Sequence, residues 1–323
     1  MTVRSHLVHL IAAAALLPVG ACKKSSNGPG GPGGPSGPSG SWATGDDGSM
    51  YNLRPDGTLG NGYDLGIEQD LLAITCRGLD TAFVVGEQGI MLRTFDGGDS
   101  WEAIDLNTTR TLRDVAAAAP DLVYVAGDQL LLVSRDSGDS FTEVAAPAQD
   151  WIQVVTDHTG AVAMALTAEG AVWRWTGGGT PQQVMSLPGA ASLSLSHGGA
   201  FAALAGARGL LARSPDGGLT WSMVDSGVTV DLHAAWITEA GDLVAVGDAG
   251  TIVRAASGGV QVQTPGAGAL RAVHINGQGE GLAAGEGGRV LHTGDAGITW
   301  QPLDVLLPTT VRGLDEVNGD GHL

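Results

Sequence analysis

Short apolar runs that end in glycine recur along the chain about every 40 residues, a spacing typical of a repeat protein. Residues 83–86 form one such run, and residues 90–94 form the apolar run that follows it after a short glycine-containing turn. A further apolar run precedes each pair, and a shorter one follows it. Glycine turns between short apolar strands predict β-hairpins. Four short strands in each repeat predict one blade of a β-propeller.

A turn motif with the pattern S/T-x-D-x-G-x-S/T-W/F closes four of the repeats. Its aspartate is expected to accept hydrogen bonds from backbone N–H groups two or three residues on, and its glycine supplies a positive φ. Its aromatic ring is expected to be buried between neighbouring sheets. We therefore expect a structural role for these residues rather than a catalytic or metal-binding one. The aspartates are Asp96, Asp136, Asp216 and Asp295, and the aromatic residues are Trp101, Phe141, Trp221 and Trp300.

The repeats set the number of blades. Six full repeats span residues 71–110, 111–149, 150–188, 189–228, 229–267 and 268–308, and the third and fifth lack the aspartate and the aromatic residue. Residues 311–315 match the first strand of a repeat, and residues 42–51 match the hairpin that should follow it. A seventh blade shared by both ends would close the ring and hide the open sheet edges. The sequence thus favours an all-β, seven-bladed propeller over residues 41–323, with six blades and a separate N-terminal hairpin as the alternative.

The N-terminus has the features of an export signal. Residues 1–21 combine Arg4 with an apolar stretch too short to be a good membrane-spanning helix. They lead into V-G-A-C, which resembles the lipobox of bacterial lipoproteins, with Cys22 as the lipidated residue. The rest of residues 22–40 forms a tether rich in Gly, Pro and Ser, with little capacity to bury anything. We expect a lipid anchor in the bacterial cell envelope. Lys23 stands where an aspartate would favour retention in the inner membrane, so we favour the outer membrane. The alternative to a lipid anchor is ordinary secretion with a chance cysteine at position 22.

The charge, the cysteine content and the missing motifs limit which partners and cofactors the chain is expected to bind. The formal net charge is −18, which disfavours a nucleic-acid partner. If Cys22 carries a lipid, Cys76 is left as a single thiol in an apolar run, and we expect it to be buried and structural. The sequence contains no H-E-x-x-H, C-x-x-C, G-x-x-x-x-G-K-S/T or G-x-S-x-G motif, so we predict no cofactor and no metal.

One candidate binding site lies in the first strand of the repeats. Three arginines share one repeat position there, and we assign Gln153 and His233 to the equivalent position in two other repeats. If these strands line a central channel, the side chains form a partly basic ring suited to a carboxylate or another anion. The alternative is structural pairing with the neighbouring Asp114, Asp231 and Asp315. The arginines are Arg113, Arg271 and Arg312.

The joint pattern V-G-x-x-G-x-I-x-R-S/T-x-D-G-G-x-T-W is carried best by residues 86–101 and nearly as well by residues 285–300. It resembles the YCF48-like Asp-box (BNR) propellers, the family of the photosystem II assembly factors. The resemblance covers the chain from about residue 41 to its end. It implies a β-propeller that acts as an assembly factor, with an arginine-rich surface that contacts the partner.

We therefore expect non-enzymatic binding of an envelope protein or peptide, of the assembly-factor or scaffold type. The alternative is a glycan-directed propeller, either a sialidase-like hydrolase or a sugar-binding module. A sialidase needs three arginines, a tyrosine nucleophile with a glutamate, and an acidic aspartate. The chain has only Tyr51, Tyr63 and Tyr124, and neither Tyr51 nor Tyr124 has a nearby glutamate in a clear role.

Overall fold

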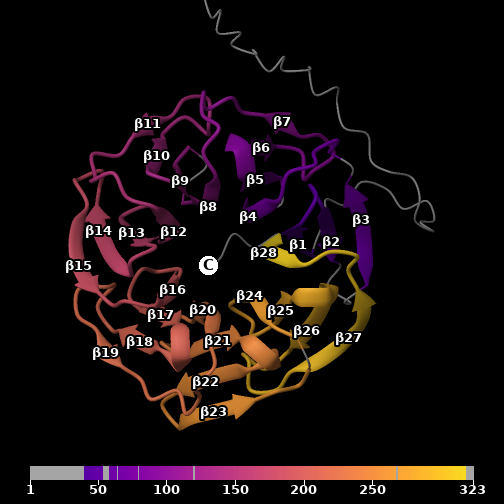
Figure 1. Ribbon diagram of the computed structural model, residues 1–323, viewed down its shortest axis with the longest axis vertical. Helices are drawn as coiled ribbons and strands as arrows, with labels where there is room; N and C mark the ends of the chain where they lie inside the picture. Colours follow the sequence, from indigo (N-terminus) through magenta and orange to yellow (C-terminus); the bar gives the residue numbers. More distant parts are fainter. Residues whose placement is uncertain are drawn as a thin grey trace, which may run out of the picture.

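Seven four-stranded antiparallel sheets surround a central axis in the computed structural model (Figure 1). The structure describes residues 40–53, 58–63, 65–78, 80–118, 121–266 and 268–317. The predicted signal segment, Cys22 and the tether up to residue 39 lie outside these residues. The seven-bladed architecture predicted from the repeat spacing is confirmed.

Six sheets each come from one continuous stretch of chain, and their strands follow one another in sequence order from the channel to the outer rim. The first two are β4 (Leu71–Arg77), β5 (Thr81–Gly86), β6 (Met91–Thr94) and β7 (Glu102–Ala103), then β8 (Leu112–Ala117), β9 (Val123–Gly127), β10 (Leu130–Ser134) and β11 (Thr142–Glu143). The next two are β12 (Trp151–Thr156), β13 (Val162–Thr167), β14 (Ala171–Thr176) and β15 (Gln182–Ser186), then β16 (Ala190–Leu195), β17 (Ala202–Gly206), β18 (Leu211–Ser214) and β19 (Ser222–Met223). The last two are β20 (Leu232–Ile237), β21 (Leu243–Gly247), β22 (Ile252–Ala256) and β23 (Gly259–Gln263), then β24 (Leu270–Ile275), β25 (Gly281–Gly285), β26 (Arg289–Thr293) and β27 (Gln301–Leu306).

Short 3-10 turns join the second and third strands of four of these blades. They are η1 (Glu87–Gly89), η2 (Ala207–Gly209), η3 (Asp248–Gly250) and η4 (Glu286–Gly288). Among the described residues, no helix is long and apolar enough to span a membrane.

Both ends of the chain contribute to the seventh blade. Its strand order is β28 (Val311–Val317), β1 (Gly40–Gly45), β2 (Met50–Leu53) and β3 (Leu59–Tyr63). Strand β28 pairs antiparallel with β1, with Ala43 opposite Leu314. The shared blade predicted from the two termini is therefore confirmed, and the six-bladed alternative is wrong.

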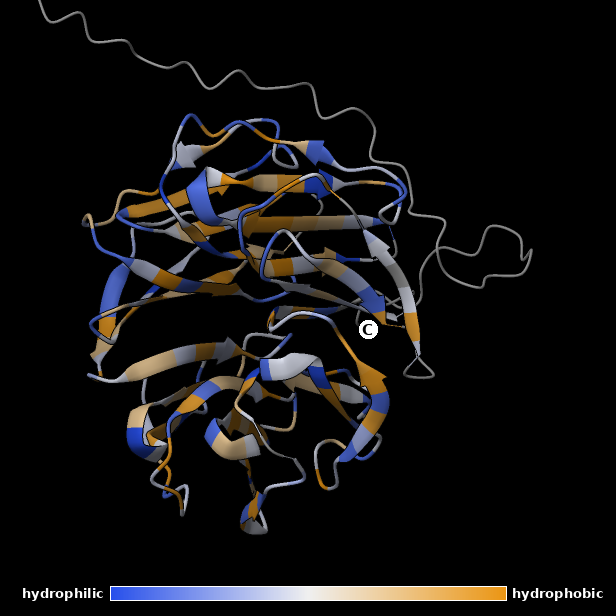
Figure 2. Cartoon of the chain, turned by 45° about the vertical axis from the view of Figure 1, so that its right-hand side comes forward, coloured by the Kyte–Doolittle hydropathy of each residue, from blue (hydrophilic) through white to orange (hydrophobic). Residues whose placement is uncertain are grey.

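Seven clusters of buried side chains lie between adjacent blades. Trp101 belongs to the cluster between β1 and the β4–β7 blade, where its ring meets Trp42 edge to face at 5.6 Å. Trp300 is similarly buried, whereas Phe141 and Trp221 are half-buried against their clusters. Hydrophobic residues accordingly follow the strands, and many hydrophilic residues lie in the turns (Figure 2). The expected burial of the Asp-box aromatic residue is complete in two of the four turns.

In the Asp-box turn, the N–H that the aspartate accepts from lies further along the chain than the sequence predicts. The Asp96 carboxylate accepts from the Ser100 N–H at 2.9 Å and from the Ser100 hydroxyl at 2.6 Å, four residues on, and also from the Thr94 hydroxyl at 2.7 Å. The other three boxes repeat these bonds, and Asp216 also accepts from an N–H three residues on. Two successive residues with positive φ, such as Gly97 and Gly98, form the turn between the aspartate and the residue that it binds. The expected reach of two or three residues was therefore mostly wrong.

Candidate functional site

The innermost strands of all seven blades line a central channel with a volume of about 410 Å³. All five residues of the predicted binding site contribute to its wall: Arg113, Gln153, His233, Arg271 and Arg312. The first strands of the repeats therefore do line the channel, as the predicted ring required.

A β-bulge sets the position of the arginines. In each inner strand the pairing with the second strand skips the second residue; Leu112 lies opposite Gly127 and Asp114 opposite Ala126, which leaves Arg113 unpaired. A bulge bends the strand and re-aims the extra side chain. The seven bulge residues are Leu72, Arg113, Ile152, Ala191, His233, Arg271 and Arg312.

The placement of Gln153 at the arginine position was wrong. In β12 the skipped residue is Ile152, so Gln153 is equivalent to Asp114 of β8, one residue further along. His233 does share the bulge position with the arginines. Four of the five predicted residues therefore occupy one ring at one mouth of the channel, and Gln153 lies deeper.

Each basic residue of the ring pairs with an acid of its own blade. In each pair within a blade, the acid directly follows the glycine that ends the second strand. The strand register places this position beside the bulge, so the acid can reach the basic side chain. The arginine side chains remain about two-fifths exposed, at 38–43%. The pairs are Arg113 with Asp128 at 2.6 Å, His233 with Asp248 at 2.7 Å, Arg271 with Glu286 at 2.6 Å, and Arg312 with Asp46 at 2.5 Å and Asp70 at 3.3 Å.

The predicted pairing with Asp114, Asp231 and Asp315 was wrong. These carboxylates instead accept backbone N–H groups: Asp114 from Val154 at 2.9 Å, Asp231 from Arg208 at 2.8 Å and Asp315 from Cys76 at 2.7 Å. Adjacent residues of a strand point to opposite faces, so sequence neighbours are poor candidates for a pair. The true partners carry a signal in the sequence, an acid directly after the glycine that ends the second strand.

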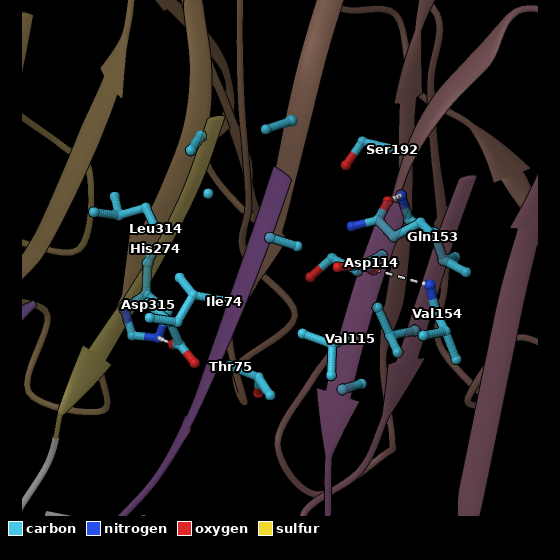
Figure 3. A pocket seen from close by; sticks show the side chains of 18 of the residues that line it. Ile74, Thr75, Asp114, Val115, Gln153, Val154, Ser192, His274, Leu314 and Asp315 are labelled. Carbon is cyan, nitrogen blue, oxygen red and sulfur yellow. Dashed lines mark hydrogen bonds and ion pairs between the residues drawn. The ribbon is translucent and has the colours of Figure 1, made fainter. Parts of the chain in front are cut away.

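Polar side chains below the arginine ring join consecutive inner strands (Figure 3). Asp114 accepts from Val154 of β12, Gln153 accepts from Leu193 of β16 at 2.6 Å, and Ser192 accepts from Ala235 of β20 at 3.0 Å. Each bond satisfies an inner-edge N–H that no further strand can pair. Gln153 thus serves as a bridge between two blades.

A second level of the channel carries Asp315 and His274, whose Oδ1 and Nε2 atoms are 3.4 Å apart (Figure 3). The His274 ring packs on Trp236 with a centroid separation of 4.3 Å. Burial raises the pKa of Asp114 to about 7, and the nearby charge of Asp315 adds to the rise, although N–H donation by Val154 and Val115 opposes it. The channel therefore contains a carboxyl group whose pKa lies near neutrality.

The constellation of a sialidase is not assembled in the described part of the channel. None of the described lining residues is a tyrosine. Tyr124 is buried between blades, where its hydroxyl accepts from the indole N–H of Trp175 at 3.2 Å. Tyr63 packs on Trp42 in the cluster that also holds Cys76. No group of three or more His, Cys, Asp or Glu residues in this part of the chain is placed to hold a metal ion.

One repeated arginine was missed as a structural residue. Arg93, Arg174 and Arg254 in the third strands donate to backbone carbonyls in the Asp-box turn of the next blade. The acceptors are Ser137 at 2.9 Å, Gly217 at 2.8 Å and Ala296 at 3.2 Å. Of these three, only Arg93 stands before S/T in the joint motif, whereas Arg174 and Arg254 hold the same strand position in repeats that lack the Asp box, so the strand position and not the motif signals this link between blades.

The fold and the channel define the class: a seven-bladed, Asp-box β-propeller with a polar channel. Residues 59–185, from β3 through most of β15, match the family described as photosynthesis system II assembly factor YCF48. Over these residues the chain is similar to the YCF48 propellers. No curated protein matches it in sequence.

Several solved structures share the fold. The structure of YCF48 bound to D1 peptide is 19% identical, with a TM-score of 0.59 over 72% of this chain and 80% of that one. YCF48 from Cyanidioschyzon merolae is 18% identical, with a TM-score of 0.59 over 75% and 87%. The WD40 propeller domain of Doa1 is 13% identical, with a TM-score of 0.61 over 76% and 86%. At these identities the likeness establishes the fold alone.

Proposed function

We propose that this propeller is a non-enzymatic binding protein that holds a peptide or protein segment over the channel mouth that carries Arg113, Arg271 and Arg312. One observation carries the proposal: three exposed guanidinium groups occupy the same bulge position around one mouth. The likeness of the fold to that of a propeller solved with a bound peptide, YCF48 with D1 peptide, supports a peptide-type partner.

The paired carboxylates orient the guanidinium groups without using all of their donors. Arg113 contacts Asp128 through Nε, and Arg271 contacts Glu286 through Nη2. A guanidinium has five N–H donors, so each pair leaves donors for the carbonyl or carboxylate oxygens of a peptide. Because the acids neutralise most of the ring's charge, we expect recognition by directional hydrogen bonds rather than by long-range attraction.

We further propose that the protein acts as a lipoprotein of the bacterial cell envelope, anchored through Cys22 and most simply at the outer membrane. The V-G-A-C sequence and the Gly/Pro/Ser tether after it support this part. Labelling cells with a radioactive fatty acid tests it: the wild type should incorporate the label and Cys22→Ser should not. Equal labelling of both proteins would contradict the anchor, and membrane fractionation would then separate the inner from the outer membrane.

Affinity purification from gently solubilised membranes tests the binding proposal. The wild type should recover a specific envelope protein that the triple variant Arg113→Ala, Arg271→Ala, Arg312→Ala does not recover. The triple Arg→Lys variant should lose most of the recovery, because lysine keeps the charge but not the planar donor fork. Arg135→Ala, an exposed arginine at an outer turn, is the matched control and should recover the partner normally. Equal recovery by the wild type and the triple Ala variant would place the site elsewhere.

A further inference from the structure

The opposite end of the channel carries a second group of basic side chains. Arg77 ends β4, five residues beyond the bulge residue Leu72, which corresponds to roughly 16 Å along a strand. His158 and His197 follow β12 and β16, and all three residues line the channel. This second mouth lies apart from the arginine ring used in the proposed function.

The three side chains are held together across three blades. Arg77 reaches past β8 and donates from Nη2 to the His158 carbonyl at 3.2 Å. The short side chains of Ala116 and Ala117 line the channel on β8 and leave room for this crossing. The imidazoles of His158 and His197 stack with a centroid separation of 4.2 Å and an interplanar angle of 14°. His158 Nδ1 lies 2.9 Å from the His197 carbonyl, and because a carbonyl only accepts, this nitrogen carries the proton.

The charge balance differs between the two mouths. Every arginine of the first mouth contacts a carboxylate, whereas no described carboxylate contacts Arg77. Burial lowers the pKa of Arg77, with no carboxylate to offset the effect. The second mouth thus holds a partly desolvated guanidinium inside a protein with a large excess of negative charge.

Two acids beside the histidine pair are already engaged. Asp157 is buried, and its carboxylate accepts from the Thr159 hydroxyl and from the N–H groups of Thr159 and Val162 in its own turn. Glu239, on the turn after β20, accepts from the Gly198 N–H at 2.8 Å. Both carboxylates serve backbone donors and leave the guanidinium for another anion.

We propose that Arg77 forms an oxyanion-binding site beside the stacked imidazoles of His158 and His197 at this second mouth, and that the site takes a carboxylate or phosphate group of a ligand that enters the channel. The guanidinium supplies a fixed charge and a planar set of donors. The stacked imidazoles form a rigid platform beside it, and their signals report on a bound ligand. The site goes beyond the proposed function, because it uses the other end of the channel and none of the residues of the arginine ring.

NMR titration of the full-length protein with inorganic phosphate, and separately with acetate, tests the site through the imidazole signals of His158 and His197. We expect saturable shifts of both signals, and the anion that binds more tightly distinguishes phosphate from carboxylate ligands. Arg77→Gln should raise the dissociation constant about tenfold or more. Arg271→Gln, at the opposite mouth, is the matched control and should leave the titration unchanged.

Three outcomes would overturn the site: no saturable shift in the wild type for either anion, equal binding by Arg77→Gln, or equal loss in Arg271→Gln. If Arg77→Gln does not fold, Arg77→Lys replaces it and should bind more weakly than the wild type, because the planar fork is lost while the charge remains. Partner recovery through the first mouth is measured separately, so failure of one proposal does not decide the other.

Discussion

Arg312 on β28 donates from Nε to Asp46, the residue that follows β1, across 2.5 Å. The two residues are 266 positions apart in sequence, and they join the last and the first described strands of the ring. The same guanidinium reaches Asp70 of the next blade at 3.3 Å. A residue of the proposed binding mouth therefore also lies at the closure of the propeller, so its two roles must be separated by experiment.

We expect Arg312→Ala to fold normally and to lose less than about 1 kcal/mol in free energy of unfolding. The Arg312 side chain is 43% exposed and that of Asp46 is 34% exposed, so water already screens the pair. The backbone pairing of β28 with β1 carries the closure instead. Urea denaturation at neutral pH measures the difference. A loss of several kcal/mol would mean that the triple alanine variant cannot report on binding alone.

Arg254→Ala should be more costly, by about 2 kcal/mol. Arg254 contacts Asp242 at 2.5 Å and the Ala296 carbonyl of the next blade, and its side chain is only 13% exposed. Removing it leaves a mostly buried carboxylate and a carbonyl without their donor. The same denaturation experiment compares it with Arg312→Ala; equal losses would contradict a structural role for the repeated arginine.

The repeat period was sufficient to predict the blades and their closure. Each blade contacts only its neighbours, so local strand and turn patterns determine the architecture. The termini followed the same logic, because residues 311–315 supply the inner strand that the N-terminal hairpin lacks.

The composition of the channel wall was harder to predict. A bulge inserts one residue without a sequence mark, so Trp151-Ile152-Gln153 fits either register and Gln153 was placed one position too early. The prediction of the ion pairs failed for a related reason. Asp128 reaches Arg113 because the hairpin pairs their strands, although the two residues are not neighbours in sequence. The stacking of His158 on His197 joins two blades, and no pattern within one repeat predicts it.

Gly98→Ala should destabilise the propeller by about 3 kcal/mol. Gly98 has a φ of +84°, and a Cβ there would lie 2.3 Å from Cη2 of the buried Trp42 ring. Gly287→Ala is the matched control, since its φ is +67° with no atom within 4 Å of the added Cβ. That control should cost about 1 kcal/mol from backbone strain alone. Similar losses in both variants would show that the contact with Trp42 is not limiting.

The Asp boxes should weaken only in strong acid. Hydrogen bonds from the Thr220 hydroxyl and N–H lower the pKa of Asp216 from 3.8 to about 2. A lowered folded-state pKa stabilises the fold above the unfolded-state pKa, and this contribution is lost as pH falls from about 4 to about 2. Thermal unfolding in this range should show a steeper fall for the wild type than for Asp216→Asn. Parallel curves would contradict the assignment.

Asp114→Asn should stabilise the propeller at neutral and alkaline pH, because Asp114 behaves in the opposite sense. Its pKa rises from 3.8 to about 7 in the folded state, mainly through burial. A raised pKa means that the stability contribution is full below about pH 4 and is lost as pH rises to about 7. The asparagine oxygen can still accept from the Val154 N–H, while the charge is removed.

The gain over the wild type should be on the order of 1 kcal/mol at pH 8 and should vanish toward pH 4, a modest value because the channel admits water. Gln153→Glu provides the reciprocal test, since Gln153 occupies the equivalent position in the next inner strand and accepts from the Leu193 N–H. It places a second carboxyl group in the same wall, so it should lose stability over the pH range in which Asp114→Asn gains it. Urea denaturation of the wild type, Asp114→Asn and Gln153→Glu at about pH 4 and about pH 8 measures how the free energy of unfolding of each variant changes with pH relative to the wild type. Differences that stay constant with pH would mean that the charge of this wall does not control its stability.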